Sequence, residues 1–454
     1  MQWRNLAQAI LLTAATLAAQ IPDANSAPGT MVVGQEMQAD TSSRPAFFGM
    51  GDENRPGRNG TLIGRPALIG TLTTAQLDAI SAGGGLLALT GAARCEVTMA
   101  QINYRTPGAH PWQSSNASAA LMVPGGAECP GPFPLLAFAR GTSLDKLHSN
   151  ADLADSGADL LMTFFVAQGY AVVATDYLGY ALSEYPFHPY MHADSEASAV
   201  IDSIRAARHA ANALGLTLNG KVMLSGYSQG GHASMAAQRA MERENRHEFD
   251  LVAAAHLAGP YNLSGALIAG IAHPIVGVQE FLPFEITALQ KVYGNVYRHV
   301  SDIFNPPYDG YIENLFPTLL SDAALAALLP GGTPVQAQEA MFTAAYLRDV
   351  ATDPANGVFR AAKKQDLLDW TPRAPMTLCG GLNDPTVPFP VNAQVAYEAF
   401  IRRGVRDVKL VDVDPEIQQA YGFLPPAIYY ANYHGALESP FCVLAARQFF
   451  DLYK

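Results

Sequence analysis

The residues of this 454-residue chain that are best suited to covalent chemistry surround one serine. Ser228 is the centre of Gly226-Tyr227-Ser228-Gln229-Gly230-Gly231, which matches the pattern G-x-S-x-G. In this pattern a strained strand-to-helix turn exposes the hydroxyl, and glycines are needed because a β-carbon there would collide with neighbouring backbone. The same letters also occur by chance in ordinary turns. Because an apolar strand (Lys221 to Ser225) precedes the motif and a helix of small residues follows it, we interpret Ser228 as a nucleophile.

A serine hydroxyl needs a histidine as base, and the histidine needs a carboxylate that fixes its tautomer. At a turn of this kind the chain order is serine, acid, histidine. Asp384 follows an apolar strand, and His434 is the only histidine after it. Asp412 and Asp414 end the next predicted strand and are weaker alternatives for the acid. We therefore predict a triad of Ser228, Asp384 and His434.

An oxyanion hole needs two backbone N–H donors. One is expected from Gln229, the residue after the nucleophile. The other is expected from the turn after the apolar run Phe133 to Ala139. In that turn Thr142 is our first choice and Gly141 the second.

Four polar residues near these motifs invite other interpretations. His188 and His192 form H-x-x-x-H, but no glutamate follows the first histidine, so we interpret them as part of a loop near the cleft. We expect His232 to pack or hydrogen-bond behind the nucleophile, and Asp176 to be structural. No spacing in the chain calls for a metal or a cofactor, and we expect neither.

The elements that must position these residues alternate between strand and helix. Such alternation is typical of the α/β class, with a mostly parallel sheet covered by helices on both faces. Two antiparallel strands, Cys95 to Arg105 and Ala119 to Val123, come first. The later predicted strands are Phe133 to Ala139, Gly169 to Thr175, Lys221 to Ser225, Met376 to Gly380 and Val408 to Val413, and the helices are 156–168, 194–214, 391–403 and one from Phe441.

Residues 264–355 interrupt the alternation with mixed apolar, aromatic, proline and glycine residues, and we predict a helical cap, or lid. The aromatic residues of this insertion are candidates for an acyl pocket or for the core of the cap: Phe281, Phe284, Tyr293, Tyr297, Phe304, Tyr308 and Tyr311. The predicted division of the chain is 1–27 signal peptide, 28–94 N-terminal arm, 95–263 and 356–454 catalytic domain, and 264–355 cap.

The N-terminus has the features of an export signal. Arg4 precedes an apolar run, Leu6 to Ala19, and small residues follow it. A plausible cleavage site lies at Ala27, and another lies near Ala18 or Ala19. The predicted location is therefore secreted or periplasmic.

The four cysteines are an even number, which in an exported chain predicts two disulfides. Three pairings are possible. We favour Cys95–Cys129 and Cys379–Cys442, because each pair brackets a segment expected to double back.

Composition excludes several classes of partner. A net charge of −12 disfavours nucleic acid and anionic lipid, so a small-molecule or polymeric neutral substrate fits better. No run of about 20 apolar residues lies beyond the N-terminus, so we expect no membrane span.

Taken in order, the motifs resemble those of the lipase A-like secretory lipases and related bacterial esterases of the α/β-hydrolase superfamily. The resemblance implies the α/β-hydrolase fold, a helical cap between nucleophile and acid, and hydrolysis of carboxylic esters. Relatives commonly have histidine where this chain has Arg140. Cutinases share the elbow but are small and lack a cap. The matching segments are Ile102 to Thr106, Arg140 to Thr142, Thr175 to Tyr180, His188 to Tyr190, Gly226 to His232, Leu382 to Pro388, and His434.

The leading functional expectation is a secreted esterase or lipase that works through an acyl-enzyme on lipid, aryl or polyester substrates. The alternatives are a peptidase or acyltransferase with the same triad, and a binding protein that retains the fold without catalysis.

Overall fold

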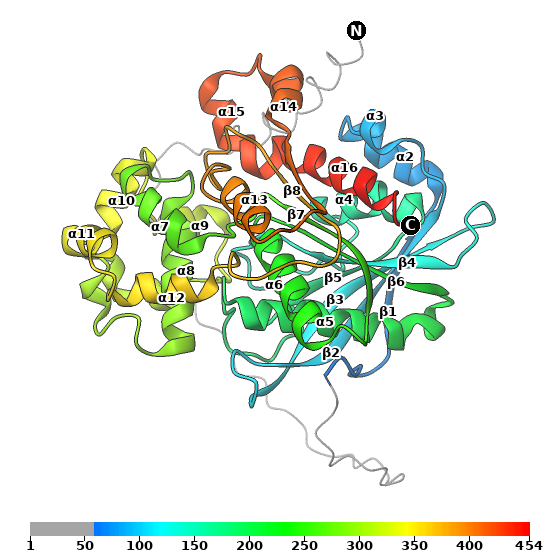
Figure 1. The fold of residues 1–454 in the computed structure, drawn as a ribbon, viewed down its shortest axis with the longest axis horizontal. Helices are drawn as coiled ribbons and strands as arrows, with labels where there is room; N and C mark the ends of the chain where they lie inside the picture. The colour runs from blue at the N-terminus through cyan, green and yellow to red at the C-terminus, as the bar shows by residue number, and fades with distance from the viewer. Residues whose placement is uncertain (1–58) are drawn as a thin grey trace, which may run out of the picture.

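The computed structural model describes residues 59–454. The predicted signal peptide and the first part of the predicted arm lie outside these residues. Within them, nine strands form one sheet (Figure 1). The strands are β1 (Ala67–Leu72), β2 (Glu96–Pro107), β3 (Ser114–Gly125), β4 (Phe133–Ala139), β5 (Ala171–Tyr177), β6 (Leu218–Tyr227), β7 (Asp250–Leu257), β8 (Met376–Gly380) and β9 (Val408–Asp412).

The order across the sheet is β1-β2-β3-β5-β4-β6-β7-β8-β9. The pairs β1–β2, β2–β3 and β3–β5 are antiparallel. All the remaining pairs, from β5–β4 to β8–β9, are parallel. Every residue of β4 is buried, because helices cover both faces of the sheet. The predicted α/β architecture is therefore confirmed.

Two hydrophobic cores lie on the two faces of the sheet. Along β4, Leu135 and Ala137 belong to one core and Leu136 and Phe138 to the other, as the two-residue period of a strand requires. The first core is closed by α5 (Ala193–Ala210), α6 (Gln229–Glu244) and α13 (Ala393–Arg402), and the second by α2 (Thr74–Gly83), α4 (Ser156–Phe164) and α16 (Ser439–Phe450).

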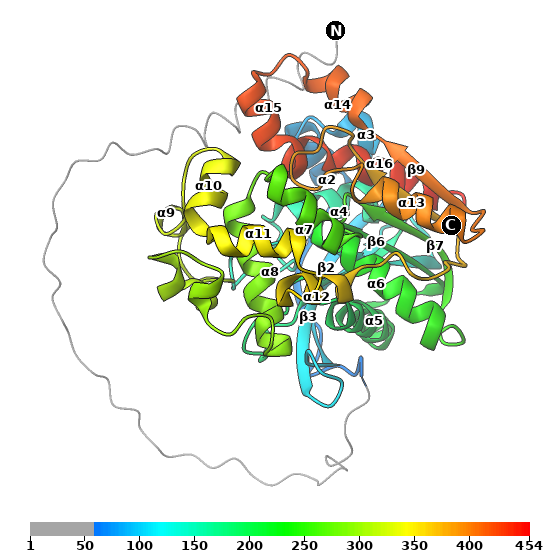
Figure 2. The same ribbon diagram turned by 60° about the vertical axis from the view of Figure 1, so that its left-hand side comes forward.

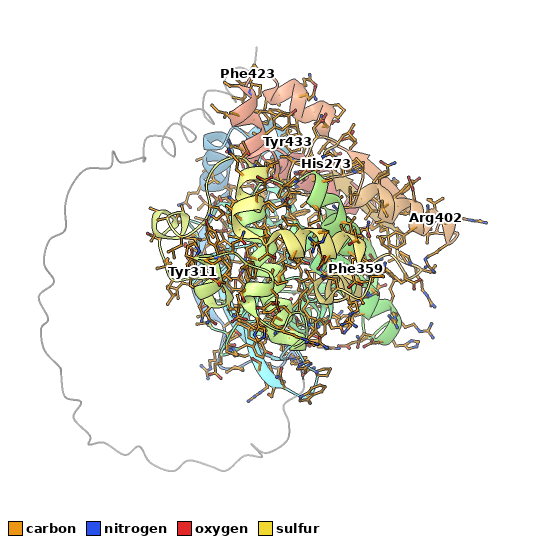
Figure 3. The ribbon with its side chains drawn as sticks, turned by 90° about the vertical axis from the view of Figure 1, so that its left-hand side faces the viewer. His273, Tyr311, Phe359, Arg402, Phe423 and Tyr433 are labelled. Atoms are coloured by element: carbon orange, nitrogen blue, oxygen red, sulfur yellow. A yellow bond between two sulfur atoms is a disulfide. The ribbon has the colours of Figure 1, made fainter. Side chains whose placement is uncertain are left out.

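A group of helices lies between β7 and β8 and projects from one side of the sheet (Figure 2). They have a hydrophobic core of their own, which includes Phe284, Phe304 and Phe342. Figure 3 looks onto these helices, with His273 near the side that faces the C-terminal segments. They are α7 (Leu263–Ala272), α8 (Val278–Tyr293), α9 (Asp322–Ala326), α10 (Pro334–Met341), α11 (Ala344–Thr352) and α12 (Gly357–Gln365).

Some elements were not expected from the sequence. Strand β7 is rich in alanine, which is a weak strand former, and its neighbours in the sheet impose the extended conformation. Part of the predicted arm is the edge strand β1 followed by α2 and the short α3 (Leu87–Thr90). Two further helices, α14 (Asp414–Tyr421) and α15 (Pro426–Asn432), lie between β9 and His434.

Two disulfides cross-link the described part of the chain. Cys95, just before β2, is bonded to Cys129 in the loop between β3 and β4, and Cys379 in β8 is bonded to Cys442 in α16. These are the pairings favoured from the sequence. Among residues 59–454, no helix combines the length and the apolar character needed to cross a membrane.

Candidate active site

Ser228 occupies the turn between the end of β6 and the start of α6. Its φ is positive, 59°, with a ψ of −121°, a strained conformation for a residue with a side chain. The glycines on either side allow this turn. A Cβ at Gly226 would lie 2.1 Å from the carbonyl oxygen of Gly230, and one at Gly230 would lie 1.8 Å from that of Ala139. Packing at this turn therefore excludes any larger residue.

His434 connects Ser228 to Asp384. Its Nε2 lies 2.7 Å from Ser228 Oγ, and its Nδ1 lies 2.7 Å from Asp384 Oδ2. The other oxygen of Asp384 accepts the backbone N–H groups of Thr386 and Val387, which fix the carboxylate. Both His434 and Asp384 are buried. The structure thus brings together the three residues of the predicted triad.

The two alternative acids lie elsewhere. Asp412 accepts the backbone N–H of Leu382, and Asp414 accepts the hydroxyl of Tyr433. Both carboxylates therefore stabilise the loop and the turn that carry Asp384 and His434, and neither touches the imidazole.

A second carboxyl group beside His434 was missed by sequence analysis. Glu438 is fully buried, and its Oε2 lies 3.5 Å from His434 Nδ1. Its Oε1 accepts the backbone N–H of Gly381 at 2.6 Å, and Tyr227 donates its hydroxyl to Oε2 at 3.2 Å. The spacing H-x-x-x-E, which places two side chains on one face of a helix, was the available signal.

The two carboxyl groups change the proton affinity of the imidazole. Burial alone would lower the pKa of His434, but the negative charges of Asp384 and Glu438 outweigh it and raise this pKa above its ordinary value. Burial, followed by the charge of Asp384, raises the pKa of Glu438. The site therefore favours the protonated form of the His434 imidazole.

The predicted oxyanion turn lies against Ser228. Gly141 lies so close that a Cβ would be 3.7 Å from Ser228 Cβ, and Thr142 lines the same pocket as Ser228. Gln229 is the first residue of α6, so its backbone N–H has no acceptor within the helix. The three predicted donor residues thus surround Ser228.

Arg140 holds this turn in place. Its guanidinium donates to the carbonyl of Gly141 at 2.9 Å and to that of Asp176 at 3.3 Å, and it stacks on Tyr180 at 4.2 Å from the ring centre. Planar stacking with several fixed donors is a property of arginine that lysine lacks. Arg140 thus fixes the backbone of the turn that carries Gly141 and Thr142.

A buried polar network lies behind Ser228. The side-chain amide of Gln229 donates to His188 Nε2 at 2.7 Å and to Glu196 at 2.8 Å. The other oxygen of Glu196 contacts His232 Nδ1 at 2.7 Å, and His232 Nε2 faces the carbonyl of Gln365. Burial and the charge of Arg140 lower the pKa of His188 to about 3, so this ring is neutral. His188 therefore positions Gln229 directly, and His232 does so through Glu196.

Asp176 is a structural residue. Its carboxylate accepts hydrogen bonds from the hydroxyls of Ser118 and Ser149 and from the backbone N–H of Asn150.

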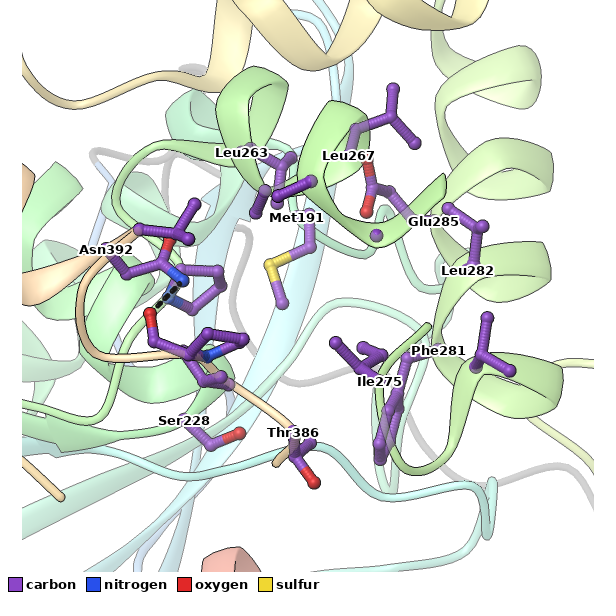
Figure 4. A pocket seen from close by; sticks show the side chains of 18 of the residues that line it. Met191, Ser228, Leu263, Leu267, Ile275, Phe281, Leu282, Glu285, Thr386 and Asn392 are labelled. Carbon is purple, nitrogen blue, oxygen red and sulfur yellow. Dashed lines mark hydrogen bonds between the residues drawn. The ribbon is translucent and has the colours of Figure 1, made fainter. Parts of the chain in front are cut away.

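A pocket of about 250 Å³ opens beside Ser228 (Figure 4). Most of its wall is apolar and comes from α7, α8 and the loop after Asp384. Of the seven aromatic residues of the insertion named above, Phe281 lines it, whereas Phe284 and Phe304 belong to the insertion's own core. The apolar lining residues include Met191, Leu263, Leu267, Ile275, Val278 and Leu282.

In residues 59–454, the His, Cys, Asp and Glu side chains with the mutual spacing of a metal site are those of Asp384, His434 and Glu438. A cation there would have to break the hydrogen bond between His434 and Asp384. The geometry therefore fits proton transfer better than metal ligation.

Comparison with known proteins gives consistent matches. A family model described as secretory lipase matches residues 149–416. Lipase A of Moesziomyces aphidis is 26% identical over 225 residues, and this match spans 44% of the chain and 46% of that lipase, less than half its length.

Solved structures match over a longer range. The rice cell wall degrading esterase LipA from Xanthomonas oryzae is 34% identical, with a TM-score of 0.77 over 86% of this chain and 98% of that one. Candida antarctica lipase A, 14% identical, covers 83% of both chains with a TM-score of 0.56, a likeness of fold alone.

Proposed function

The chain belongs to the secretory lipase family and has the α/β-hydrolase fold, and on this premise we propose that it is a secreted serine esterase that hydrolyses carboxylic esters through an acyl-enzyme. The observation that carries the proposal is the continuous hydrogen-bonded chain from Ser228 through His434 to Asp384 at the wall of an apolar pocket. Two disulfides and the apolar N-terminal segment support export.

In the proposed mechanism, Ser228 Oγ attacks the ester carbonyl carbon while His434 Nε2 takes the hydroxyl proton. The backbone N–H groups of Gln229 and Thr142, with Gly141 beside them, stabilise the negative oxygen of the tetrahedral intermediate. The imidazolium then gives its proton to the leaving alcohol, and an acyl-enzyme remains.

Water completes the cycle by attacking the acyl carbonyl while His434 again accepts a proton. The second tetrahedral intermediate collapses, the carboxylic acid leaves, and Ser228 recovers its proton from His434. Asp384 holds the imidazole in the tautomer that both steps need.

The substrate class follows from the pocket, whose apolar wall favours an ester with an aliphatic or aryl chain. The Xanthomonas relative is described as degrading the rice cell wall, so plant polyesters belong among the substrates to be tested beside lipids.

The test is hydrolysis of a short-chain p-nitrophenyl ester by Ser228→Ala. We expect kcat to fall by ~10⁴-fold or more, because no other nucleophile lies at this turn. Ser198→Ala, on the outer side of α5, is the matched control and should retain full activity. Appreciable activity of Ser228→Ala would refute the proposal.

Two further experiments separate the alternatives. A peptidase would cleave peptides. An acyltransferase would transfer the acyl group to an added alcohol faster than to water. A binding protein without catalysis would fail to react with a fluorophosphonate probe, whereas an esterase should be labelled at Ser228.

A further inference from the structure

The pocket beside Ser228 contains one carboxyl group. Glu285 projects from α8 into the pocket, on the side away from Ser228 and next to Leu267 and Leu282 (Figure 4). Its neighbours in the wall are mainly aliphatic. A carboxyl group in such a place is costly unless something hydrogen-bonds to it.

Glu285 has no such partner. The residue is only 8% exposed, and its Oε1 makes no hydrogen bond with any residue of the described part of the chain. Two other buried polar side chains of the pocket wall do have partners. Gln338 donates to the carbonyl of Gly270, and Asn392 donates to that of Pro388. The carboxyl of Glu285 differs from these two amides in having no hydrogen bond.

From this arrangement we infer that Glu285 is a specificity-determining residue, which forms a hydrogen bond with a hydroxyl group carried by the otherwise aliphatic chain of the ester substrate. The inference rests on the proposed esterase function and deepens it. Ser228 and Glu285 lie apart along the pocket, so a chain whose ester group is at Ser228 passes apolar side chains before it reaches the carboxyl.

The protonation of Glu285 favours a hydroxyl over a cation. Burial, followed by the charge of Asp366, raises the pKa of Glu285 to about 8, so the group is mostly neutral at pH 7. A neutral carboxyl both donates and accepts one hydrogen bond, which matches a hydroxyl group, whereas an ammonium group would need the ionised form.

The hydroxyl can belong to the acyl chain or to the alcohol of the ester, and two substrate series distinguish these sources. In the first, p-nitrophenyl esters differ only in the position of one hydroxyl along the acyl chain. In the second, the hydroxyl moves along the alcohol chain of an ester with a fixed acyl group. Each series includes the ester without that hydroxyl.

We expect one position in one series to raise kcat/KM by ~10-fold or more over the plain ester, the size of one buried hydrogen bond. Glu285→Leu should abolish this preference, so that the hydroxylated and the plain ester are cleaved with similar kcat/KM. Glu285→Gln, which can still donate and accept, should retain most of it. Glu280→Leu, on the same helix but outside the pocket wall, is the control and should behave as the wild type.

The inference is overturned if no position in either series is preferred, or if Glu285→Leu keeps the preference. Failure of the proposed function is a different result, in which the plain ester is not cleaved or is cleaved equally well by Ser228→Ala. If the Glu285 variants do not fold, the inference can still be tested in a protein that keeps Glu285. In Ser228→Ala, the preferred hydroxylated ester should raise Tm more than the plain one, and equal shifts would also overturn the inference.

Discussion

Replacing Asp384 by asparagine tests how the two carboxyl groups share the support of His434. In a serine triad, the change from aspartate to asparagine usually lowers kcat by ~10⁴-fold, because the imidazole is held in the wrong tautomer. Here Glu438 lies 3.5 Å from the same nitrogen that Asp384 contacts at 2.7 Å. With an effective dielectric constant of about 20, Coulomb's law gives the imidazolium roughly 5 kcal/mol of attraction to an ionised Glu438 and roughly 6 kcal/mol to Asp384.

The same substitution also changes the charge of Glu438. Asp384 helps to raise the pKa of Glu438, so its removal lowers that pKa and leaves Glu438 more ionised at neutral pH. An ionised Glu438 can then accept the Nδ1 proton of His434. We therefore expect Asp384→Asn to lose only ~10²- to 10³-fold in kcat, and Asp384→Asn/Glu438→Gln to lose a further ~10-fold or more.

The assay is steady-state hydrolysis of a p-nitrophenyl ester by the two single variants, the double variant and the wild type at pH 7. Glu438→Gln alone should lose less than ~10-fold, because Asp384 still fixes the tautomer. Asp407→Asn is the control, since Asp407 is exposed just before β9 and does not belong to the site. If Asp384→Asn is as inactive as the double variant, Glu438 does not support His434 and the reasoning is wrong.

Three other predictions concern the turn, the disulfide and the base. Arg140→Lys should lower kcat by ~10- to 100-fold with little change in KM, because lysine cannot hold the Gly141 carbonyl and stack at once; an unchanged kcat would contradict this. Cys379→Ser/Cys442→Ser should lower the free energy of unfolding, measured in urea, by about 4 kcal/mol, since the bond closes a loop with a sequence separation of 63; an unchanged midpoint would contradict this. Because only neutral imidazole accepts the serine proton and the pKa of His434 is raised, kcat/KM should increase with pH from neutral into the alkaline range; a plateau already reached at pH 6 would contradict this.

Two strands that follow a clear apolar pattern could be predicted from sequence to the residue, β4, which ends at Ala139, and β8. For β3 and β6 only the apolar centre was predicted, and sheet pairing extends both strands beyond it. Strand β7 was not predicted, because its alanines favour a helix over a strand. Pairing with β6 and β8 makes this segment extended. The helices α14 and α15 are short and are separated by a glycine and prolines. Neither is long enough to show a clear 3.6-residue repeat of apolar residues.

For the candidate site, chain order led to Ser228, Asp384 and His434, because a known mechanism restricts which residue types come in which sequence. It did not lead to Glu438 or Glu285. A glutamate on a helix is usually solvated, and whether it is buried depends on what packs against the helix from distant parts of the chain. Composition and spacing along the chain do not contain that information.

The place of the helical insertion has a consequence for how this protein can diversify. Helices α7 to α12 join two neighbouring strands, β7 and β8, while Ser228, Asp384 and His434 all lie outside them. The last helix of the group, α12, contacts the elbow helix through Gln365 and His232, and Val276, before α8, donates its backbone N–H to the carbonyl of Pro385 beside Asp384. Changes at the side chains of α7 and α8 that line the pocket can therefore remodel this wall while these backbone contacts, and the reaction, stay constant. In evolution or in a mutant library, substitutions in this wall can therefore change substrate specificity without changing the catalytic residues.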